Sequence, residues 1–346
     1  MQNFVTVKQE HAYKCHEPLV HNVSFQDDEI KSYFYTQITT PEQKCPPEGY
    51  FEFDNVFSYE EKFLYREGNI FEITCVDFLQ KNELENVIDG KIKSENFTKI
   101  ALSNRIDIIF CKAGSGNFGH FLTECAPRLL NLRGLNKKFR IHLPRESAMF
   151  ANIVVDICEY MGLDVEVRIG RLGEVTHYKK AIYLSAVSQH NTRKSLTFKN
   201  FRDLILDMYK IKHNVNNKIY ICRNKNEKRS IENQDDLIGK LSDLGFVIVH
   251  PTHHSFRTQV EIFSSASVLC GSLGAGFTNI MWASEGCRSF FIDPGLTDYF
   301  FWDIANIMNQ RFHWYFQGPV SRWSQEFSER NYEINTDDVM RQVRAI

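Results

Sequence analysis

The clearest local signal for chemistry is a glycine-rich segment, residues 270–279, in the second half of the chain. It follows a short apolar stretch and opens a predicted helix, and its glycines keep side chains out of the way. Backbone N–H groups in such a loop can approach an anion closely, and the helix N-terminus adds about half a positive charge. The segment therefore predicts an anion-binding loop, with a tight turn that binds nothing as the alternative.

A pair of arginines strengthens the anion-binding interpretation. Arg223 directly follows a predicted strand at residues 219–222, and Arg229 lies in the loop beyond it. Ligands of open α/β sheets sit beyond the carboxyl ends of strands, and a planar guanidinium can donate two parallel hydrogen bonds to phosphate. The arginines and the glycine-rich segment would then face one crevice. The alternative is a pair of solvated charges beside Lys225 and Lys228.

A candidate acid–base pair lies in the first half of the chain. His120 and Glu124 are four residues apart and therefore share one face of a helix predicted at residues 118–133, with Arg128 a further turn along. A histidine whose second ring nitrogen is held by a carboxylate can act as a general base. The alternative is a buried histidine that Glu124 satisfies structurally. Pro127 removes one helical hydrogen bond and should kink this helix.

The glycines that precede this helix allow a different activity. Residues 114–119 match the pattern G-x-G-x-x-G between a predicted strand and a predicted helix, which is the fingerprint of dinucleotide-binding proteins. The fingerprint also needs an acidic residue at the end of the next strand, about twenty residues on. The next predicted strand is followed by Pro144 and Arg145, and Glu146 is the nearest acid. An NAD(P)-dependent oxidoreductase is therefore the weaker alternative.

The acidic residues and histidines bear on metal binding. No Asp-x-Asp sequence occurs, and the histidines at 250, 253 and 254 have no second cluster with the spacing of a transition-metal site. Enzymes that hold a nucleotide diphosphate through a divalent ion usually need closely spaced carboxylates. We therefore expect no metal or other cofactor, so that arginines and a helix dipole would neutralise a bound diphosphate. Asp293 ends a predicted strand, where it either accepts hydrogen bonds from a ribose or caps a turn.

The elements that would position these residues follow a regular rhythm after residue 100. Predicted strands and helices alternate, which is typical of a parallel sheet covered by helices on both faces. A polar break at residues 213–218 separates this series from a second, cleaner one. We predict two α/β units, residues 1–213 with an irregular, strand-containing start and residues 218–325. A last helix within residues 326–346 is predicted to pack back on the first unit.

Composition limits the classes of function. The 346 residues include 41 basic and 43 acidic side chains, and a net charge of −2 argues against a nucleic-acid partner, which needs a basic face or stripe. No apolar run is long enough to span a membrane, and the first residues lack the apolar core of a signal peptide. Nine scattered cysteines without C-x-x-C spacing favour a reducing compartment over a disulfide scaffold or zinc site. These features predict a cytoplasmic protein, free or peripherally attached at the inner face of a membrane.

Taken together, the motifs resemble glycosyltransferase family 61. The C-terminal half of that family has an arginine after a strand, an arginine and an asparagine before a helix, a glutamine-containing helix, a Gly-Ala-Gly-x-Thr-Asn loop and an acid–proline strand end. This chain has the same features in the same order, at Arg223, Arg229, Asn233, Gln259, residues 274–279 and Asp293-Pro294. Residues 117–129 also resemble the family's N-terminal segment, Asn-Phe-x-His-Phe-Leu-x-Glu followed by Pro-Arg-Leu. The resemblance covers about residues 106–294.

This resemblance implies a GT-B architecture, in which two Rossmann-type units with parallel sheets face a central cleft. It also implies an inverting transferase that uses nucleotide-activated sugars without a required metal. By resemblance, the C-terminal unit is the donor side and the N-terminal unit is the acceptor side. The acceptor-side residues are Asn117 and Arg128. The residues assigned to the donor are Arg223, Arg229, Asn233, Ser272, Gly274, Ala275, Gly276, Thr278, Asn279 and Asp293.

Two positions depart from the family pattern. Many members have a histidine directly before Gly-Ala-Gly, where this chain has Leu273, and a glutamate where this chain has Gln234. A role for that histidine in contacting the donor phosphate therefore does not carry over to this chain. The change leaves Arg223 and the amides of the loop unaffected.

The sequence thus predicts a hexosyl- or pentosyltransferase that moves a sugar from a nucleotide-diphosphate donor, with UDP-sugars expected first. The expected acceptor is a glycan or lipid-linked glycan in the biosynthesis of a surface polysaccharide, capsule or lipopolysaccharide. The acceptor hydroxyl would lose its proton to His120, positioned by Glu124, or to Glu124 itself. Arg223, Arg229 and loop amides would stabilise the departing diphosphate. The alternatives are the oxidoreductase above and a non-catalytic glycan-binding or assembly protein.

Overall fold

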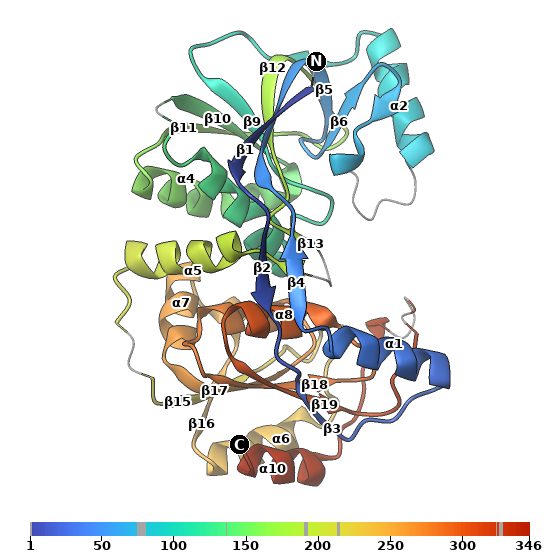
Figure 1. The fold of residues 1–346 in the computed structure, drawn as a ribbon, viewed down its shortest axis with the longest axis vertical. Coiled ribbons are helices and arrows are strands. Elements are labelled where there is room, and N and C mark those ends of the chain that lie inside the picture. The colour runs from blue at the N-terminus through green and yellow to red at the C-terminus, as the bar shows by residue number, and fades with distance from the viewer. Residues whose placement is uncertain are drawn as a thin grey trace. The chain divides into compact units, whose positions relative to one another are not determined.

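The chain folds into two compact units, shown in Figure 1. The computed structural model describes residues 2–74, 81–135, 137–189, 193–212, 215–322, 324 and 328–346. The first unit comprises Met1–His11 and Cys45–Gln189, and the second comprises Ala12–Lys44 and His190–Ile346. The chain therefore begins in the first unit, passes into the second, returns to the first and ends in the second.

The first unit contains a mixed sheet of nine strands among the described residues, in the order β11-β10-β9-β12-β5-β6-β7, with β1 paired to β5 and β8 to β12. Strands β9 to β12 pair in parallel, whereas β12 pairs antiparallel with β5. The strands are β1 (Gln2–Lys8), β5 (Glu48–Tyr59), β6 (Phe63–Arg66), β7 (Asn69–Ile70), β8 (Thr98–Lys99), β9 (Ile106–Ile109), β10 (Lys138–Leu143), β11 (Asp164–Ile169) and β12 (Val175–Leu184).

Only the parallel half of this sheet was predictable from the strand–helix rhythm. β9 and β10 bury Ile108, Ile109 and Ile141 completely, as expected for strands covered on both faces. The antiparallel half comes from β5 and its neighbours in the first 70 residues, where only short isolated runs were expected. The predicted mixture of α and β structure with parallel strands is confirmed, whereas the prediction of a fully parallel sheet in this unit is wrong.

The helices of the first unit differ from expectation near His120. The predicted helix at residues 118–133 is three short pieces, α3 (Phe118–His120), a π-helix (η2, Phe121–Cys125) and a 3-10 helix (η3, Ala126–Leu132). The N–H of Ala126 bonds to the carbonyl of Phe121, and Pro127 has no N–H with which to continue an α-helix. The remaining helical segments are η1 (Glu72–Thr74), α2 (Lys81–Lys93), η4 (Arg145–Phe150) and α4 (Ala151–Tyr160).

The second unit is a parallel sheet of six described strands in the order β16-β15-β17-β18-β19-β3. These strands are β3 (Leu19–His21), β15 (Asn217–Ile221), β16 (Phe246–Val249), β17 (Ala266–Ser272), β18 (Arg288–Asp293) and β19 (Arg311–Phe316). The other described strands of the chain are β2 (His11–Lys14), which pairs with β4 (Glu42–Cys45), and also β13 (Ser188–Gln189) and β14 (Arg193–Lys194).

Helices cover both faces of this parallel sheet, as predicted (Figure 1). Helices α6 and α10 lie on one face, and α7 and α8 lie on the other. The helical segments are α1 (Asp28–Ile38), α5 (Leu196–Met208), α6 (Gln234–Asp243), η5 (Pro251–His253), α7 (Phe256–Ser264), η6 (Ala275–Trp282), α8 (Tyr299–Ile307) and α10 (Thr336–Arg344).

Two boundaries in the predicted domain division differ from the structure. Helix α5 falls within the predicted first domain but joins the second unit, where Arg202 donates to the carbonyl of Ala283 at 3.1 Å. Residues 12–44 also belong to the second unit, because β3 pairs with β19. Residues 213 and 214 of the predicted linker lie outside the described residues.

The last helix also packs elsewhere than predicted. Helix α10 buries Val339, Met340 and Val343 in the same apolar cluster as Leu237 and Leu241 of α6, so it completes the core of the second unit. The expectation that this helix packs back on the first unit is therefore wrong.

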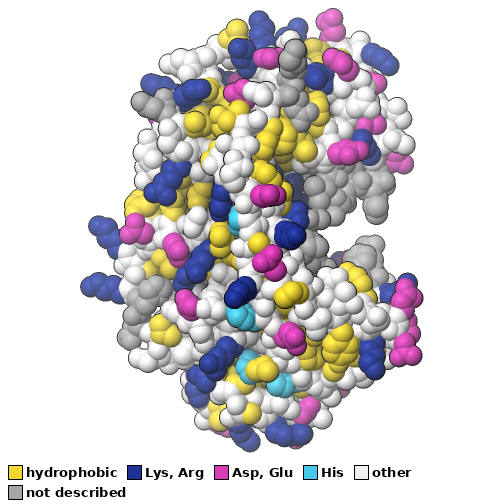
Figure 2. Space-filling view, in the orientation of Figure 1, with side chains coloured by type: hydrophobic (Ala, Val, Ile, Leu, Met, Phe, Trp, Pro, Cys, Tyr) yellow, Lys and Arg dark blue, Asp and Glu magenta, His cyan; other side chains and the backbone are white. Residues whose placement is uncertain are grey.

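The surface carries charges of both signs, since lysine and arginine side chains are interspersed with aspartate and glutamate over the face seen in Figure 2. Within the described part of the chain, no helix is both long and apolar enough to cross a membrane.

Candidate functional site

The strand order of the second unit defines where a ligand would bind. Strands β16 and β17 lie on opposite sides of β15, so the connections reverse direction there and the carboxyl ends of β15 and β17 flank a topological switch point. Open α/β sheets bind ligands at such a point. Arg223 follows β15 and Ser272 ends β17, so the first two signals in the sequence meet at this edge of the sheet.

Arg223 lies directly against the glycine-rich loop. Its Nη1 donates to the carbonyl of Leu273 at 3.0 Å, and a Cβ atom on Gly274 would lie 1.4 Å from that nitrogen. Its Nη2 donates to the carbonyl of Lys228 at 2.7 Å and lies 3.1 Å from a carboxylate oxygen of Glu227. Only glycine at position 274 leaves room for the guanidinium, so the predicted proximity of this arginine and the loop is confirmed.

A second guanidinium lies close enough to influence the first. Burial lowers the pKa of Arg223, Glu227 raises it, and the charge of Arg229 lowers it further. No hydrogen bond or ion pair joins Arg229 to another described residue, and its Nε is buried without a partner. Its backbone has a φ of 64°, a conformation that non-glycine residues adopt rarely. Arg223 and Arg229 therefore place two positive charges close together beside the loop, with the carboxylate of Glu227 against the first.

Several buried hydroxyl groups around the loop have no hydrogen-bond partner among the described residues. They include Thr278 on η6 and the pair formed by Ser272 and Tyr332, whose oxygens lie near each other without hydrogen-bond geometry. More than nine-tenths of buried polar groups in native proteins have a hydrogen-bond partner. A cluster of buried hydroxyls without one therefore indicates a ligand or bound water. Ala275 and Gly276, half-exposed at the start of η6, also present N–H groups that a helix start leaves without helical partners.

Tyr332 is a site residue that sequence reasoning missed. It lies beside Ile231, with which it forms an isolated β-bridge, and its hydroxyl lies near Ser272. Burial raises the pKa of Tyr332, while the charges of Arg223 and Arg229 lower it. No motif surrounds Tyr332 in the sequence, and only the return of the C-terminal segment brings it to the loop.

Two asparagines assigned to the donor instead hold the scaffold of the site. The side-chain amide of Asn279 donates to Gln259 of α7 and to the carbonyl of Gly276, each at 3.0 Å, and its oxygen accepts from Trp282. Asn233 bonds through both side-chain atoms to the backbone of Ile334, at 2.8 and 3.0 Å. Asn279 is fully buried, so it and Gln259 fix the loop rather than face a ligand.

Asp293 serves as a turn cap in this structure. One of its carboxylate oxygens accepts from the N–H groups of Gly295 and Leu296, at 2.8 and 2.7 Å, and the other accepts from Trp314 at 3.0 Å. The carboxylate is fully buried, and burial raises its pKa to about 6. Of the two roles left open by the sequence, the structure shows the turn cap, and Asp293 thereby shapes the segment that leads into α8.

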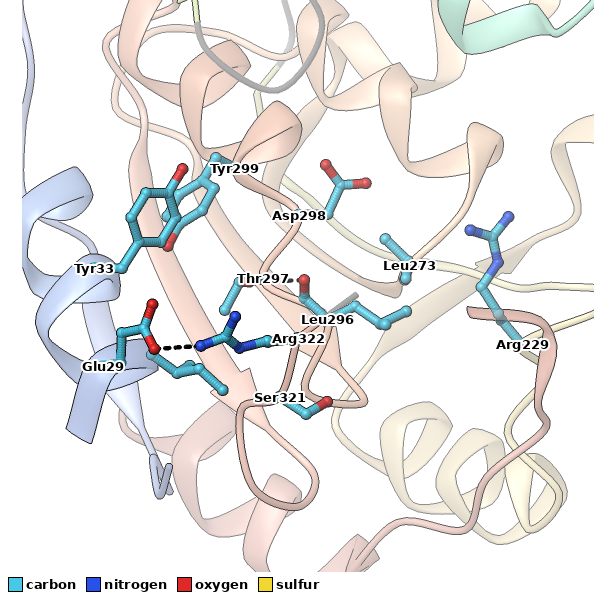
Figure 3. Close-up of a pocket in the computed structure, with 11 residues that line it drawn as sticks. Glu29, Tyr33, Arg229, Leu273, Leu296, Thr297, Asp298, Tyr299, Ser321 and Arg322 are labelled. Atoms are coloured by element: carbon cyan, nitrogen blue, oxygen red, sulfur yellow. Dashed lines mark hydrogen bonds and ion pairs between the residues drawn. The ribbon is translucent and has the colours of Figure 1, made fainter. Parts of the chain in front are cut away.

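A pocket of about 400 Å³ opens beside the loop, entirely within the second unit. Figure 3 shows Arg229 at one end, Leu273 and Leu296 in the middle, and Tyr33 with Tyr299 at the other end. Its volume lies in the range of about 300–1,000 Å³ that is usual for ligand sites. The lining residues are Glu29, Ile30, Tyr33, Arg229, Leu273, Leu296, Thr297, Asp298, Tyr299, Ser321 and Arg322.

The acid–base pair of the first unit has the predicted contact. The Nδ1 of His120 lies 2.9 Å from one carboxylate oxygen of Glu124, and the ammonium of Lys112 bonds to the other oxygen. Glu124 is 1 % exposed at its side chain, whereas His120 is 29 % exposed. The histidine is therefore the member of the pair that substrate can reach, and Glu124 with Lys112 orients it. The π-helix that carries Glu124 is a form often found at functional sites.

The two residues assigned to the acceptor side hold the segment that carries His120 and Glu124. The side-chain oxygen of Asn117 accepts from the N–H groups of Gly119 and His120, at 2.9 and 3.4 Å, and so caps α3. Arg128 is 3 % exposed and donates to the carbonyl of Glu124 at 2.6 Å and to the hydroxyl of Tyr183 at 2.9 Å. In this structure both side chains position the His120 segment, and Arg128 is too buried to contact an acceptor.

The G-x-G-x-x-G segment is packed against protein. A Cβ atom on Gly116 would lie 2.9 Å from the Cβ of Glu146, and the hydroxyl of Ser115 bonds to Ser147 at 2.8 Å. The helix that follows is a single short turn, α3. This arrangement does not favour a dinucleotide at residues 114–119. Among the described residues, no group of three or more His, Cys, Asp or Glu side chains is arranged to hold a metal ion.

Comparison with known proteins assigns the chain to a family. A comparison with curated protein sequences gave no match. The family model for Glycosyltransferase 61 matches residues 118–290, which is half of the chain. The matched segment contains His120 and Glu124, both arginines and the glycine-rich loop. The chain therefore belongs to glycosyltransferase family 61, and the family implies a sugar donor and an acceptor as substrates.

Proposed function

We propose that this glycosyltransferase transfers a hexosyl or pentosyl unit from a nucleotide-diphosphate sugar, most simply a UDP-sugar, with inversion and without a metal ion. The observation that carries the proposal is the switch point of the second unit. There, the guanidinium groups of Arg223 and Arg229, the N–H groups at the start of η6 and unpartnered buried hydroxyls converge. These groups suit a diphosphate better than any neutral ligand.

In this proposal the second unit stabilises the leaving group. As the bond between the anomeric carbon and the diphosphate breaks, negative charge develops on the departing phosphate oxygens. Arg229 donates to these oxygens, and Arg223 supplies charge while it holds the loop through Leu273. Donors fixed in advance need no rearrangement when the charge develops, so they stabilise the transition state more than the ground state.

The proposed base is His120 in the first unit. It accepts the proton of the acceptor hydroxyl as that oxygen forms its bond to the anomeric carbon, on the face opposite the diphosphate. The carboxylate of Glu124 holds the other side of the imidazole and stabilises the imidazolium that forms. Glu124 is buried and bonded at both oxygens, which supports a positioning role over the role of base.

The proposed acceptor is a glycan or lipid-linked glycan in the biosynthesis of a surface polysaccharide, capsule or lipopolysaccharide, at the cytoplasmic side of a membrane. This setting rests on the resemblance to family members and on the composition of the chain. The GT-B arrangement, with an acceptor side in the first unit and a donor side in the second, is part of the same proposal.

A turnover assay tests this function. Purified protein is incubated with a panel of nucleotide sugars in the presence of EDTA, and release of nucleoside diphosphate is measured with and without glycan acceptors. The proposal predicts release from one class of donor without added metal, and a product of inverted anomeric configuration by NMR. Donor binding with no release under any acceptor would instead support a non-catalytic glycan-binding or assembly protein.

A further inference from the structure

The N-terminal segment contributes one wall of the pocket beside the glycine-rich loop. Helix α1 is anchored on the second unit by Phe34, which is fully buried and contacts the rings of Trp314 and Phe316 at centroid distances of 5.5 and 5.6 Å. Asp27 caps the helix by accepting from the N–H of Ile30 at 2.8 Å. The helix therefore has a fixed place in this unit, although the family match does not extend to it.

Helix α1 presents Glu29 and Tyr33, one turn apart, to the pocket. The residue Tyr33 is 60 % exposed, and its ring meets the Tyr299 ring edge-on, with centroids 6.3 Å apart and an interplanar angle of 80°. Glu29 pairs with Arg322 at the rim (Figure 3). An exposed aromatic face held by a buried neighbour can stack a flat ring without prior rearrangement.

Two buried hydroxyl groups also line this pocket. The hydroxyl of Ser321 has no hydrogen-bond partner within the described ranges of the chain. The hydroxyl of Tyr299, a residue only 5 % exposed, lies near that of Thr297. An unpartnered buried hydroxyl such as that of Ser321 is an expected donor or acceptor for a ligand.

The chemistry of the pocket changes along its length. Arg229 gives one end positive charge, Leu273 and Leu296 line the middle together with the polar side chains of Thr297 and Asp298, and Tyr33 with Tyr299 makes the far end aromatic (Figure 3). A nucleoside diphosphate has the same sequence of parts, because its anionic phosphates, its ribose and its flat base follow one another.

We propose that α1 forms the nucleoside subsite of the donor, with the base stacked on Tyr33 and the ribose between Leu296 and Ser321. This inference rests on the proposed function, since it takes the diphosphate to lie at Arg229. It adds that a helix from the N-terminal segment, outside the segment matched by the family model, sets the affinity for the nucleoside part.

The test compares Tyr33→Ala with Tyr35→Ala in the full chain. Tyr35 is a matched control, since it lies on the same helix, is 40 % exposed and contacts Phe25 and Phe34 instead of lining the pocket. Calorimetry measures the dissociation constants of UDP, GDP, CDP, ADP and inorganic pyrophosphate, and thermal unfolding verifies that each variant is folded. Tyr33→Phe keeps the aromatic face and serves as the rescue variant.

The expected result is a loss of about tenfold to a hundredfold in affinity for the preferred nucleoside diphosphate in Tyr33→Ala, the usual scale for base stacking on an aromatic side chain. Pyrophosphate affinity should stay unchanged, and Tyr33→Phe and Tyr35→Ala should bind like the wild type. Unchanged nucleotide affinity in Tyr33→Ala would overturn the inference and leave the proposed function intact. An equal loss for nucleotide and pyrophosphate, or a loss confined to the intact nucleotide sugar, would also overturn it. If the wild type binds neither nucleotide nor pyrophosphate, the proposed function itself fails.

Discussion

At the scale of residues, one close contact shapes the proposed anion site. The Nη1 of Arg223 occupies the space where any residue other than glycine would place its Cβ at position 274. The same guanidinium bonds to the carbonyl of Leu273, so the arginine and the loop fix each other. Arg229 has no such partner in the described parts of the chain, which leaves it available for a ligand.

Substitution of Gly274 should therefore weaken nucleotide binding without unfolding the protein. The Cβ in Gly274→Ala displaces the end of a flexible side chain, so the guanidinium of Arg223 moves and the loop loses its charge. We expect affinity for UDP to fall at least about tenfold, the scale of a lost charge-assisted hydrogen bond. Gly239→Ala is the control, because a Cβ there meets nothing within 4 Å in α6. Equal affinity in the two variants, measured by calorimetry, would contradict this account of the loop.

Substitution of His120 separates chemistry from donor binding. In His120→Gln the acceptor loses its base, so the transfer rate should fall by about 10²–10⁴-fold while affinity for UDP is unchanged. Glu124→Gln keeps the base and removes the carboxylate that holds it, so the rate should fall less and the pH profile should shift. Single-turnover rates across pH distinguish the two. If Glu124→Gln abolishes transfer while His120→Gln retains it, Glu124 is the base.

The limits of sequence reasoning are also visible at the scale of residues. Asn279, Asn233 and Asp293 belong to the motifs by which the family is recognised, yet their side chains bond to protein atoms. A motif shows that a residue type is needed. Only the fold shows whether that residue faces a ligand or holds in place another residue that faces it. Tyr332 shows the converse, because it reaches the loop without any motif around it.

At the scale of elements, short irregular segments position several of the candidate site residues. The π-helix carries Glu124 toward His120, and the turn after β18 leads into Tyr299 of α8. Asp293 holds that turn by accepting from two backbone N–H groups. Helix periodicity predicts amphipathic helices such as α6 well. It cannot predict these segments, because their geometry depends on Pro127 and on the buried carboxylate of Asp293.

The turn held by Asp293 should make stability depend on pH. Burial raises the pKa of this carboxyl to about 6 in the folded protein, above its ordinary value of 3.8. The folded state therefore binds the proton more tightly, and the stabilisation that protonation gives is lost as the pH rises from about 4 to about 6. The free energy of unfolding of the wild type, relative to Asp293→Asn, should fall by about 3 kcal/mol over that window. Urea unfolding at several pH values measures it, and a relative stability that rises with pH would contradict the sign.

At the scale of the whole molecule, each unit is assembled from separate stretches of chain. The parallel sheet of the second unit was predictable from its regular strand–helix alternation, and its carboxyl edge was the expected place for a ligand. The presence of β3 and α1 in this unit was not predictable, because β3 pairs with β19, which is almost the whole chain away in sequence. No local pattern encodes such a contact, so the wall of the pocket that contains Tyr33 required the structure.

The central claim is that guanidinium groups and backbone amides, with no divalent cation, hold the diphosphate at the carboxyl edge of the second unit's sheet. Calorimetric titration of UDP into the wild type, Arg229→Ala and Arg257→Ala, all in EDTA, tests it most directly. Arg257 is the control, since it is 61 % exposed at its side chain and pairs with Glu261 on α7. We expect UDP to bind to the wild type and to Arg257→Ala, and the affinity to fall at least about tenfold in Arg229→Ala. Binding that disappears in EDTA and returns with Mg²⁺ or Mn²⁺, or Arg229→Ala that binds as tightly as the wild type, would contradict it.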